Sequence, residues 1–309
     1  MVTPITVCMA VYNGMPYLEQ QLASLAAQDD PAFRVLIQDD GSTDASAACI
    51  RAFCDRDPRF FHGAHQGEHL GPAGNFLDML TQVSGLIALC DQDDVWQKNR
   101  LSRTREEMAR AEQTHPGLPC LVHSDLSVID SEGHLLFPSM FQHQGWDFSA
   151  TGLPAFLVQN NVTGCTMLLN EPLRALAVKA IGSDLFMHDW LIAQTAAAFG
   201  TVFPIAESLV SYRQHAHNQI GASQKGTLSR VLHAVTGWKR TKARMDWNWR
   251  EAECLRDTLG KSLPPQAQET LETFLHIRRL PKLHRAPALI RGGFLMQSPM
   301  TRLGQLLLT

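Results

Sequence analysis

The chain has 309 residues with a formal net charge of −3, and 45% of them are hydrophobic, which is sufficient for one large core or for one domain with an appendage. Its seven cysteines form no Cys-x-x-Cys pair, which argues against a zinc module or a disulfide framework and favours a reducing compartment. Because no long apolar run and no cationic leader occur, we expect no membrane span, no secretory signal and a cytoplasmic location.

Charge is distributed unevenly along the chain. Residues 1–224 carry 12 Lys and Arg against 24 Asp and Glu, whereas residues 225–309 carry 15 against 6. Such asymmetry indicates that the basic end has a different task from the acidic body. We therefore expect a catalytic domain at 1–223 and a basic helical extension at 224–309.

Strand-like and helix-like segments alternate through the first half of the chain. Short apolar runs predict strands at 5–10, 33–38, 59–62, 86–90 and 120–123. Helical spacing of apolar residues predicts helices from 16, from 42 or 44 to 54, from 72, and from 96 to 113. This alternation predicts an α/β fold with a mostly parallel sheet, in which ligands bind beyond the carboxyl ends of the strands.

Three aspartates, Asp91, Asp93 and Asp94, follow the strand expected at 86–90. Carboxylates crowded at one strand end repel one another unless a cation lies among them. Mg²⁺ and Mn²⁺ prefer such oxygen ligands. The cluster therefore predicts a Mn²⁺ or Mg²⁺ site, and an acidic loop that caps the next helix is the alternative.

A second acidic turn, containing Asp39 and Asp40, follows the strand at 33–38. A carboxylate accepts hydrogen bonds from a pyrimidine N–H and from a ribose hydroxyl. The turn is therefore a candidate for nucleotide recognition, and a tight turn with a helix cap is the alternative.

Asp189 lies at the start of a helix expected to run to about residue 199. The positive end of a helix stabilises a carboxylate, and a general base must accept the proton of an attacking hydroxyl. Asp189 is therefore a candidate base, with a plain helix cap as the alternative.

Two more polar segments are candidates for substrate contact. Arg213 and His215 follow a strand-like run, and an arginine can hold phosphate oxygens in a bidentate pair. An edge strand that enters a polar loop is the alternative. The polar turn at 160–166 contains groups that can line a sugar site.

Taken in order, several motifs resemble family 2 glycosyltransferases of the GT-A fold. The matching text is VCMAVYNGMPYLEQQLASLAAQ, VLIQDDGSTDAS, HLGPAGNF, LCDQDDVWQKNRL, MHDWLIA and VSYRQHAHN, which spans about residues 5–218. The variants DQDDVW, HDW and YRQH look most like the bacterial branch that includes rhamnosyltransferases of cell-surface polysaccharide synthesis. The resemblance implies a Rossmann-like sheet flanked by helices, followed here by a helical extension.

The resemblance also implies a role for each matching residue. The donor and nucleotide would lie among Val11, Tyr12, Asn13, Asp39, Asp40, Asn75, Asp91, Gln92, Arg213 and His215. Asp93 would bind the metal, with Asp91 or Asp94 as alternatives, and Asp189 would be the catalytic base. The acceptor and sugar would contact Asn160, Gly164, Cys165, His188 and Trp190.

The implied activity is an inverting transfer from a UDP- or dTDP-sugar to a hydroxyl of a glycan or lipid-linked acceptor. The chain has no QxxRW motif, so we expect single-sugar transfer, and we expect no nucleic-acid partner. A sugar nucleotidyltransferase is one alternative, although the turn at 11–14 has no Lys or Arg for a triphosphate. A non-catalytic nucleotide-sugar-binding protein is the other.

The extension has a cluster of cations among tryptophans, formed by Trp238, Lys239, Arg240, Lys242, Arg244, Trp247 and Trp249. Indoles favour the membrane interface, and cations favour anionic headgroups. The cluster predicts peripheral contact with the inner face of the cytoplasmic membrane. Packing on the catalytic domain or a homodimer interface is the alternative.

Overall fold

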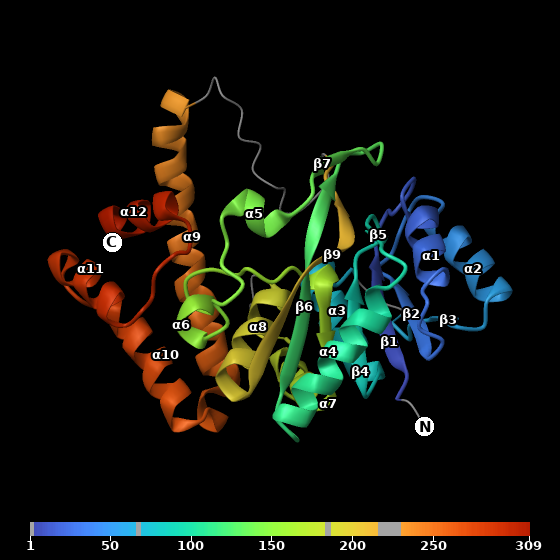
Figure 1. The fold of residues 1–309 in the computed structure, drawn as a ribbon, viewed down its shortest axis with the longest axis horizontal. Helices are drawn as coiled ribbons and strands as arrows, with labels where there is room; N and C mark the ends of the chain where they lie inside the picture. Colours follow the sequence, from blue (N-terminus) through green and yellow to red (C-terminus); the bar gives the residue numbers. More distant parts are fainter. Residues whose placement is uncertain (1–2, 66–68, 183–186, 216–229) are drawn as a thin grey trace.

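The computed structural model describes residues 3–65, 69–182, 187–215 and 230–309, with side chains for all of these except 230–242. A central sheet is covered by helices, and four C-terminal helices form a layer at one side (Figure 1). The expected α/β fold with a helical extension is confirmed. The expected boundary at 223/224 lies outside the described residues, as do the side chains of Trp238, Lys239, Arg240 and Lys242.

Nine strands of the described residues form one mixed sheet. They are β1 (Ile5–Val11), β2 (Phe33–Asp39), β3 (Phe60–His62), β4 (Leu86–Cys90), β5 (Val95–Trp96), β6 (Cys120–Ile129), β7 (Leu135–Phe137), β8 (Met167–Leu169) and β9 (Thr201–Arg213). Their order is β3-β2-β1-β4-β8-β6-β9-β5, and β7 pairs with β6. The half formed by β3, β2, β1 and β4 is parallel, whereas β8 runs antiparallel to both β4 and β6.

Two hydrophobic cores lie on the two faces of the sheet, because successive strand side chains point to opposite faces. One core joins Val7 and Met9 of β1 to the helices α1 (Leu18–Ala26), α2 (Ser46–Arg56) and α4 (Arg100–Thr114). The other joins Cys8 to α3 (Gly71–Gln82), α7 (Glu171–Ala177) and α8 (His188–Phe199). Short helices α5 (Met140–Gln144) and α6 (Leu153–Phe156) and the turns η1 (Gly164–Thr166) and η2 (Val178–Ala180) complete this part.

The C-terminal layer consists of α9 (Arg230–Leu259), η3 (Gly260–Ser262), α10 (Pro265–Ile277), α11 (Lys282–Arg291) and α12 (Pro299–Leu308). Most of its buried apolar side chains, among them Leu255 and Phe294, belong to the same core cluster as α3 and α8. Trp249 is 6% exposed and stacks on Phe274, with ring centroids 4.2 Å apart. The extension is therefore packed against the catalytic part, and Trp249 is a core residue rather than a membrane anchor.

Two of the differences from the expected element boundaries arise from strand pairing. Val95–Trp96 forms β5, which pairs antiparallel with β9, so the helix expected from residue 96 begins at Arg100. Strand β6 continues to Ile129, because its second half pairs with β9 as well. Within the described residues, no helix combines the length and apolarity needed to cross a bilayer.

Candidate active site

The loops that follow β1, β2 and β4 meet at one edge of the sheet. These strands are parallel and in register, with Val11 opposite Asp39 and Met9 opposite Cys90. Carboxyl ends of parallel strands point the same way, so the two acidic turns predicted from the sequence lie side by side. Val11 itself is buried, and its carbonyl accepts the Asp40 N–H at 2.8 Å.

Side-chain amides join these loops to one another. The Gln92 amide makes two hydrogen bonds to the backbone of Tyr12, accepting its N–H at 2.7 Å and donating to its carbonyl at 2.9 Å. Asn13 donates its N–H to Ser42 and accepts the N–H of Thr43, both at 2.8 Å. The backbone around Tyr12 is therefore fixed from both neighbouring strands.

The two carboxylates of the second turn have different tasks. Asp40 is 3% exposed, and its two oxygens accept the backbone N–H groups of Leu70 and Gly71 at 2.8 and 2.9 Å, where α3 begins. Asp39 uses Oδ1 to accept from the N–H and hydroxyl of Ser42, and no described residue bonds to its Oδ2. Asp39 is thus the better placed of the two to accept from a ligand.

Tyr12 presents an exposed ring beside this turn. Its side chain is 46% exposed, and its ring centroid lies 4.4 Å from that of His69. His69 Nδ1 lies 2.9 Å from Asp40 Oδ2. An exposed aromatic ring fixed next to a carboxylate is a suitable surface for a nucleotide base.

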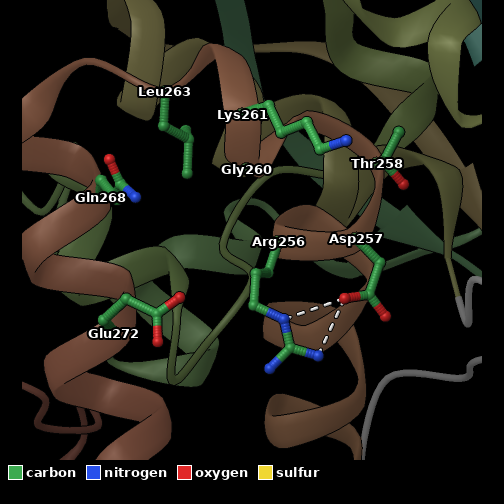
Figure 2. A pocket seen from close by; sticks show the side chains of 8 residues that line it. All are labelled: Arg256, Asp257, Thr258, Gly260, Lys261, Leu263, Gln268 and Glu272. Carbon is green, nitrogen blue, oxygen red and sulfur yellow. Dashed lines mark hydrogen bonds and ion pairs between the residues drawn. The ribbon is translucent and has the colours of Figure 1, made fainter.

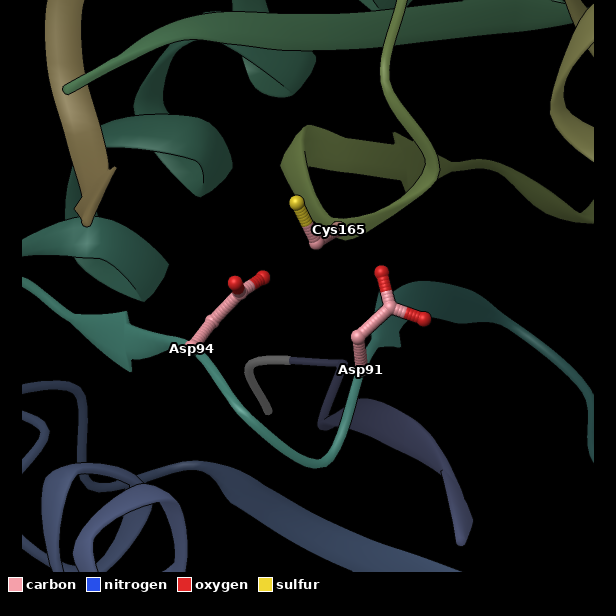
Figure 3. A group of neighbouring side chains, drawn as sticks. All are labelled: Asp91, Asp94 and Cys165. Atoms are coloured by element: carbon pink, nitrogen blue, oxygen red, sulfur yellow. The ribbon is translucent and has the colours of Figure 1, made fainter. Parts of the chain in front are cut away.

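Asp91 and Asp94 begin and end the acidic loop after β4, and Cys165 of η1 lies over both (Figure 3). One carboxylate oxygen of each aspartate and the Cys165 sulfur lie within 4.8 Å of one another. Burial, followed by the charges of Asp93 and Asp189, raises the pKa of Asp91. Burial, followed by the charges of Asp93 and Asp91, raises the pKa of Asp94 well above its ordinary value. The loop concentrates negative charge that a bound cation would offset.

Asp93 lies between these two residues in the sequence but contacts another part of the chain. Its Oδ2 lies 2.7 Å from His215 Nε2, and its side chain is 15% exposed. The His215 ring stacks on Tyr17, with centroids 5.0 Å apart. The chain therefore brings together Asp93 and His215, two of the residues assigned to the site from the sequence.

Arg213 is bonded within the protein. It is 1% exposed, and its guanidinium donates to the carbonyls of Asp93, Asp130 and Ser131 and to the side chain of Gln20. Among the described residues the cation is directed at protein oxygens, and its contact with phosphate stays a prediction. Arg213 fixes the position of the acidic loop.

Arg100 was missed by the sequence reasoning. It is fully buried, its guanidinium carbon lies 3.4 Å from the Trp96 ring centroid, and it donates to the carbonyl of Cys165 at 2.7 Å. Burial lowers the pKa of Arg100 to about 10. Asp94 interacts electrostatically with this cation, so Arg100 partly balances the buried carboxylates. Its place within the motif DQDDVWQKNR was the only signal in the sequence.

Asp189 lies in the first turn of α8 and is 7% exposed. Its Oδ2 accepts the backbone N–H of Gly164 at 3.3 Å, whereas Oδ1 has no hydrogen-bond partner among the described residues. Burial raises the pKa of Asp189 to about 7. Asp189 is also close enough to Asp91 for its charge to raise the pKa of Asp91. A buried carboxylate with one oxygen bonded and the other without a partner among the described residues is suited to accept a proton.

Several residues expected to touch the sugar or donor are interior residues. Trp190 donates its indole N–H to the carbonyl of Phe156 at 2.6 Å and is 5% exposed. Asn75 is 2% exposed and bonds to Gln38. The polar groups of both side chains are therefore bonded within the protein, and both residues anchor helices to the interior.

The remaining predicted residues lie around the Asp189 segment. His188 is buried against the Phe76 ring, at 4.3 Å between centroids, and burial lowers its pKa to about 3. Asn160 accepts the N–H of Val162 and shapes the loop that leads to Gly164. Gly164 and Cys165 are thus the members of the predicted sugar site that border the acidic cluster.

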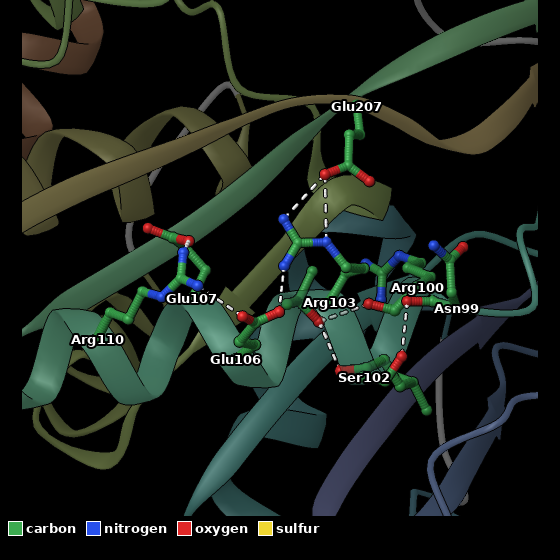
Figure 4. A network of polar contacts seen from close by, with 10 residues as sticks. Asn99, Arg100, Ser102, Arg103, Glu106, Glu107, Arg110 and Glu207 are labelled. Atoms are coloured by element: carbon green, nitrogen blue, oxygen red, sulfur yellow. Dashed lines mark hydrogen bonds and ion pairs between the residues drawn. The ribbon is translucent and has the colours of Figure 1, made fainter.

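Two other polar groupings lie apart from this site. On α4, Arg103 and Arg110 pair with Glu106 and Glu107, and Arg103 reaches Glu207 of β9 (Figure 4). These exposed pairs brace a helix against a strand. A hollow between α9, η3 and α10 is lined by residues of the extension alone, with Arg256 and Asp257 paired beside it (Figure 2).

The sequence of this chain is similar to those of several known proteins. The model of the family "Glycosyl transferase family 2" matches residues 6–176. The dTDP-rhamnosyl transferase RfbG of Shigella flexneri is 25% identical over 227 residues, which cover 70% of this chain and 74% of RfbG. The chain spans 57% of the length of three mycobacterial relatives.

Solved structures show the same fold. The S. aureus TarS fragment 1–349 in complex with UDP-GlcNAc has a TM-score of 0.54 at 13% identity, covering 98% of this chain and 88% of the fragment. The mannosyltransferase PcManGT of Pyrobaculum calidifontis, in complex with GDP-Man and Mn²⁺, has a TM-score of 0.52 at 16% identity, covering 98% of this chain and 84% of the neighbour.

Proposed function

This chain belongs to glycosyl transferase family 2, and we propose that it moves one sugar from a UDP- or dTDP-sugar to a hydroxyl of a glycan or lipid-linked acceptor, with inversion. The domain boundary near residue 223 is part of the same proposal. The observation that carries it is a separate carboxylate, Asp189, which lies near the acidic loop after β4 and has one oxygen hydrogen-bonded and the other without a partner among the described residues.

Asp189 supplies the base in this proposal. The acceptor hydroxyl attacks the anomeric carbon of the sugar, the new carbon–oxygen bond forms as the bond to the diphosphate breaks, and the acceptor proton passes to Asp189 Oδ1. The electron pair of the broken bond leaves with the nucleoside diphosphate. One displacement from the face opposite the leaving group inverts the anomeric centre, so no enzymic nucleophile is required, unlike a retaining hydrolase.

The donor lies along the loops joined by Gln92. Tyr12 offers its exposed ring to the base, and Asp39 Oδ2 offers an acceptor for a base N–H or a ribose hydroxyl. The names of the relatives support this class of donor: RfbG is named for a dTDP-sugar, and TarS was solved with UDP-GlcNAc.

A divalent cation fits the acidic loop. Asp93 is the accessible carboxylate and Asp91 is partly exposed, whereas Asp94 is fully buried behind them, with an unbonded Oδ2 among the described residues. We assign Mg²⁺ or Mn²⁺ to Asp93 with Asp91, because oxygen ligands suit these ions and the Cys165 thiol does not. When bound, such an ion offsets the charge of the departing diphosphate. PcManGT was solved with Mn²⁺.

The extension supports a membrane-facing acceptor. Leu283 and Ile290 of α11 are 90% and 55% exposed, and they lie seven residues apart on one helix face. On α12 the exposed apolar residues are Met300, Leu303 and Leu307. Residues 273–309 contain six Lys and Arg and no Asp or Glu. We propose that this basic, apolar surface contacts anionic lipid at the cytoplasmic face of the membrane. The competing proposal is that a second copy of the chain binds to this surface to form a homodimer.

The donor class is tested by thermal shift. The protein is mixed with Mn²⁺ and one of a panel of UDP-, dTDP- and GDP-sugars. We expect a UDP- or dTDP-sugar to raise its unfolding temperature. A ligand at 100 times its dissociation constant adds about 2.7 kcal/mol to the free energy of unfolding. Sugar-1-phosphate with a nucleoside triphosphate serves as the contrasting pair, because product formation from it would identify a nucleotidyltransferase. Donor binding with no transfer to any acceptor would indicate a binding protein.

A further inference from the structure

We infer that the C-terminal extension completes the active site, with Asn248 and Glu251 of α9 acting as positioning residues for Asp189. This inference rests on the proposed role of Asp189 as the base. It assigns to the extension a task in turnover that is separate from any contact with a membrane.

Asn248 and Glu251 lie three residues apart, so they occupy one face of α9. They are 2% and 0% exposed. Glu251 Oε1 accepts the backbone N–H of Met187 at 3.2 Å, and Asn248 Nδ2 donates to the carbonyl of Val158 at 2.8 Å. Each residue therefore contacts the backbone of a different segment of the catalytic part.

The two contacted segments meet at the proposed base. Met187 is the residue immediately before α8, two positions from Asp189. Val158 lies in the segment that leads from the end of α6 to Gly164, whose N–H is the group bonded to Asp189 Oδ2. The distance between Gly164 and Asp189 is thus set partly by where α9 holds the segments that lead to them.

Further hydrogen bonds connect α8, the 156–164 segment and the extension. Trp190 and Gln194 of α8 both donate to the carbonyl of Phe156, at 2.6 and 3.2 Å. Gln297, between α11 and α12, bonds through its N–H to the Gln159 side chain at 3.1 Å. Helix α8, the 156–164 segment and the extension therefore hold one another through polar contacts at fixed points.

Asn248 and Glu251 are polar residues within an otherwise apolar interface. Neighbouring α9 residues Trp249, Ala252 and Leu255 are buried in the apolar core. Placing a glutamate in such an interface is unfavourable unless its oxygens are bonded. The hydrogen bond that Glu251 accepts from the Met187 N–H therefore favours a positioning role over simple packing.

Two substitutions of Glu251 separate positioning from charge. Glu251→Gln keeps an oxygen that can accept the Met187 N–H, whereas Glu251→Met keeps the length and removes the acceptor. We expect Glu251→Met to lower kcat about 10- to 100-fold, the effect of misplacing a reacting group by about 1 Å. Glu251→Gln should stay within about threefold of the parent, and donor Kd should be unchanged in both. Asp246→Asn, an exposed position on the same helix, is the matched control.

Asn248→Ala gives a second test that does not depend on Glu251. It should lower kcat with unchanged donor Kd, and it carries the test alone if Glu251→Met does not fold. Hydrogen exchange supplies a readout without turnover: backbone N–H groups in peptides covering 158–166 and 187–190 should exchange faster in Glu251→Met and Asn248→Ala, but not in Asp246→Asn.

Three results would overturn the inference: parent-like kcat in Glu251→Met and Asn248→Ala, equal loss in Glu251→Gln and Glu251→Met, or donor affinity falling in step with kcat. A failure of the proposed function has a different signature. In that case the unsubstituted protein shows no transfer, or Asp189→Asn keeps full turnover.

Discussion

Asp93 and Asp94 are adjacent in the sequence, yet they bond to different partners. Asp93 Oδ2 lies 2.7 Å from His215 Nε2, whereas Asp94 Oδ1 accepts the backbone N–H of Arg213 at 3.1 Å. The Asp93 side chain is 15% exposed, and Asp94 is fully buried. In the proposed metal site, Asp93 is therefore the carboxylate that can exchange its partner for an ion, and Asp94 is part of the scaffold.

This difference predicts opposite outcomes for two neighbouring substitutions. Asp93→Asn should leave the unfolding temperature nearly unchanged and should remove the effect of Mn²⁺ on donor affinity. Asp94→Asn should alter stability first, because it changes a buried network that contains Arg213 and Cys165. Calorimetric titration of donor with and without EDTA measures the first effect, and thermal unfolding measures the second. Equal metal dependence in the parent and Asp93→Asn would remove Asp93 from the metal site.

The sequence supplied the strand ends and hence the position of the site. Strand–turn patterns around Asp39 and Asp91 placed both acidic turns at one sheet edge, and the register of β1 with its neighbours confirms this. Local sequence patterns are informative here because each loop follows directly from its strand.

Long-range partners could not be read from the sequence. Arg213 looked like a phosphate ligand, but the carbonyls it bonds, such as that of Asp130, come together only in the folded chain. Buried residues such as Arg100 and Glu251 were not identified, because a charged residue usually lies at the surface and single-sequence patterns carry no sign of its burial. The position of β8, antiparallel between β4 and β6, could not be predicted either, because a strand of three residues has too little periodicity to be recognised in the sequence.

The raised pKa of Asp189 predicts how stability depends on pH. The folded state keeps this proton up to about pH 7, whereas the unfolded chain releases it near the ordinary value of 3.8. The folded state thus binds more protons between these values, so this group lowers the free energy of unfolding as pH rises from 4 to 7. The effect has an upper limit on the order of 4 kcal/mol.

Asp189→Asn removes that dependence. Its unfolding temperature relative to the parent should be higher at pH 8 than at pH 5, measured by calorimetry without metal. Asp246→Asn, an exposed carboxylate, should show no such change between the two pH values. Identical differences at both pH values for Asp189→Asn would mean that the carboxyl is already ionised at pH 5.

The apolar surface of α11 and α12 predicts binding to charged vesicles. We expect co-sedimentation with anionic but not neutral liposomes, reduced by high salt, because each cation near such a surface contributes about 1 kcal/mol. Leu283→Gln combined with Met300→Gln should weaken binding. Leu135→Gln, at a position 61% exposed on β7, is the matched control. Binding that ignores lipid charge, or concentration-dependent dimerisation lost in the double variant, would assign this surface to another partner.

The role of Asp189 is tested most directly by kcat of Asp189→Asn with saturating donor and acceptor. The amide still offers an oxygen to the Gly164 N–H, so the loop should keep its place, but it cannot take up the acceptor proton. We predict a loss of about 10²- to 10⁴-fold in kcat with donor Kd unchanged. A kcat within a few-fold of the parent would contradict the proposal and would leave Asp189 as a residue that only organises the start of α8.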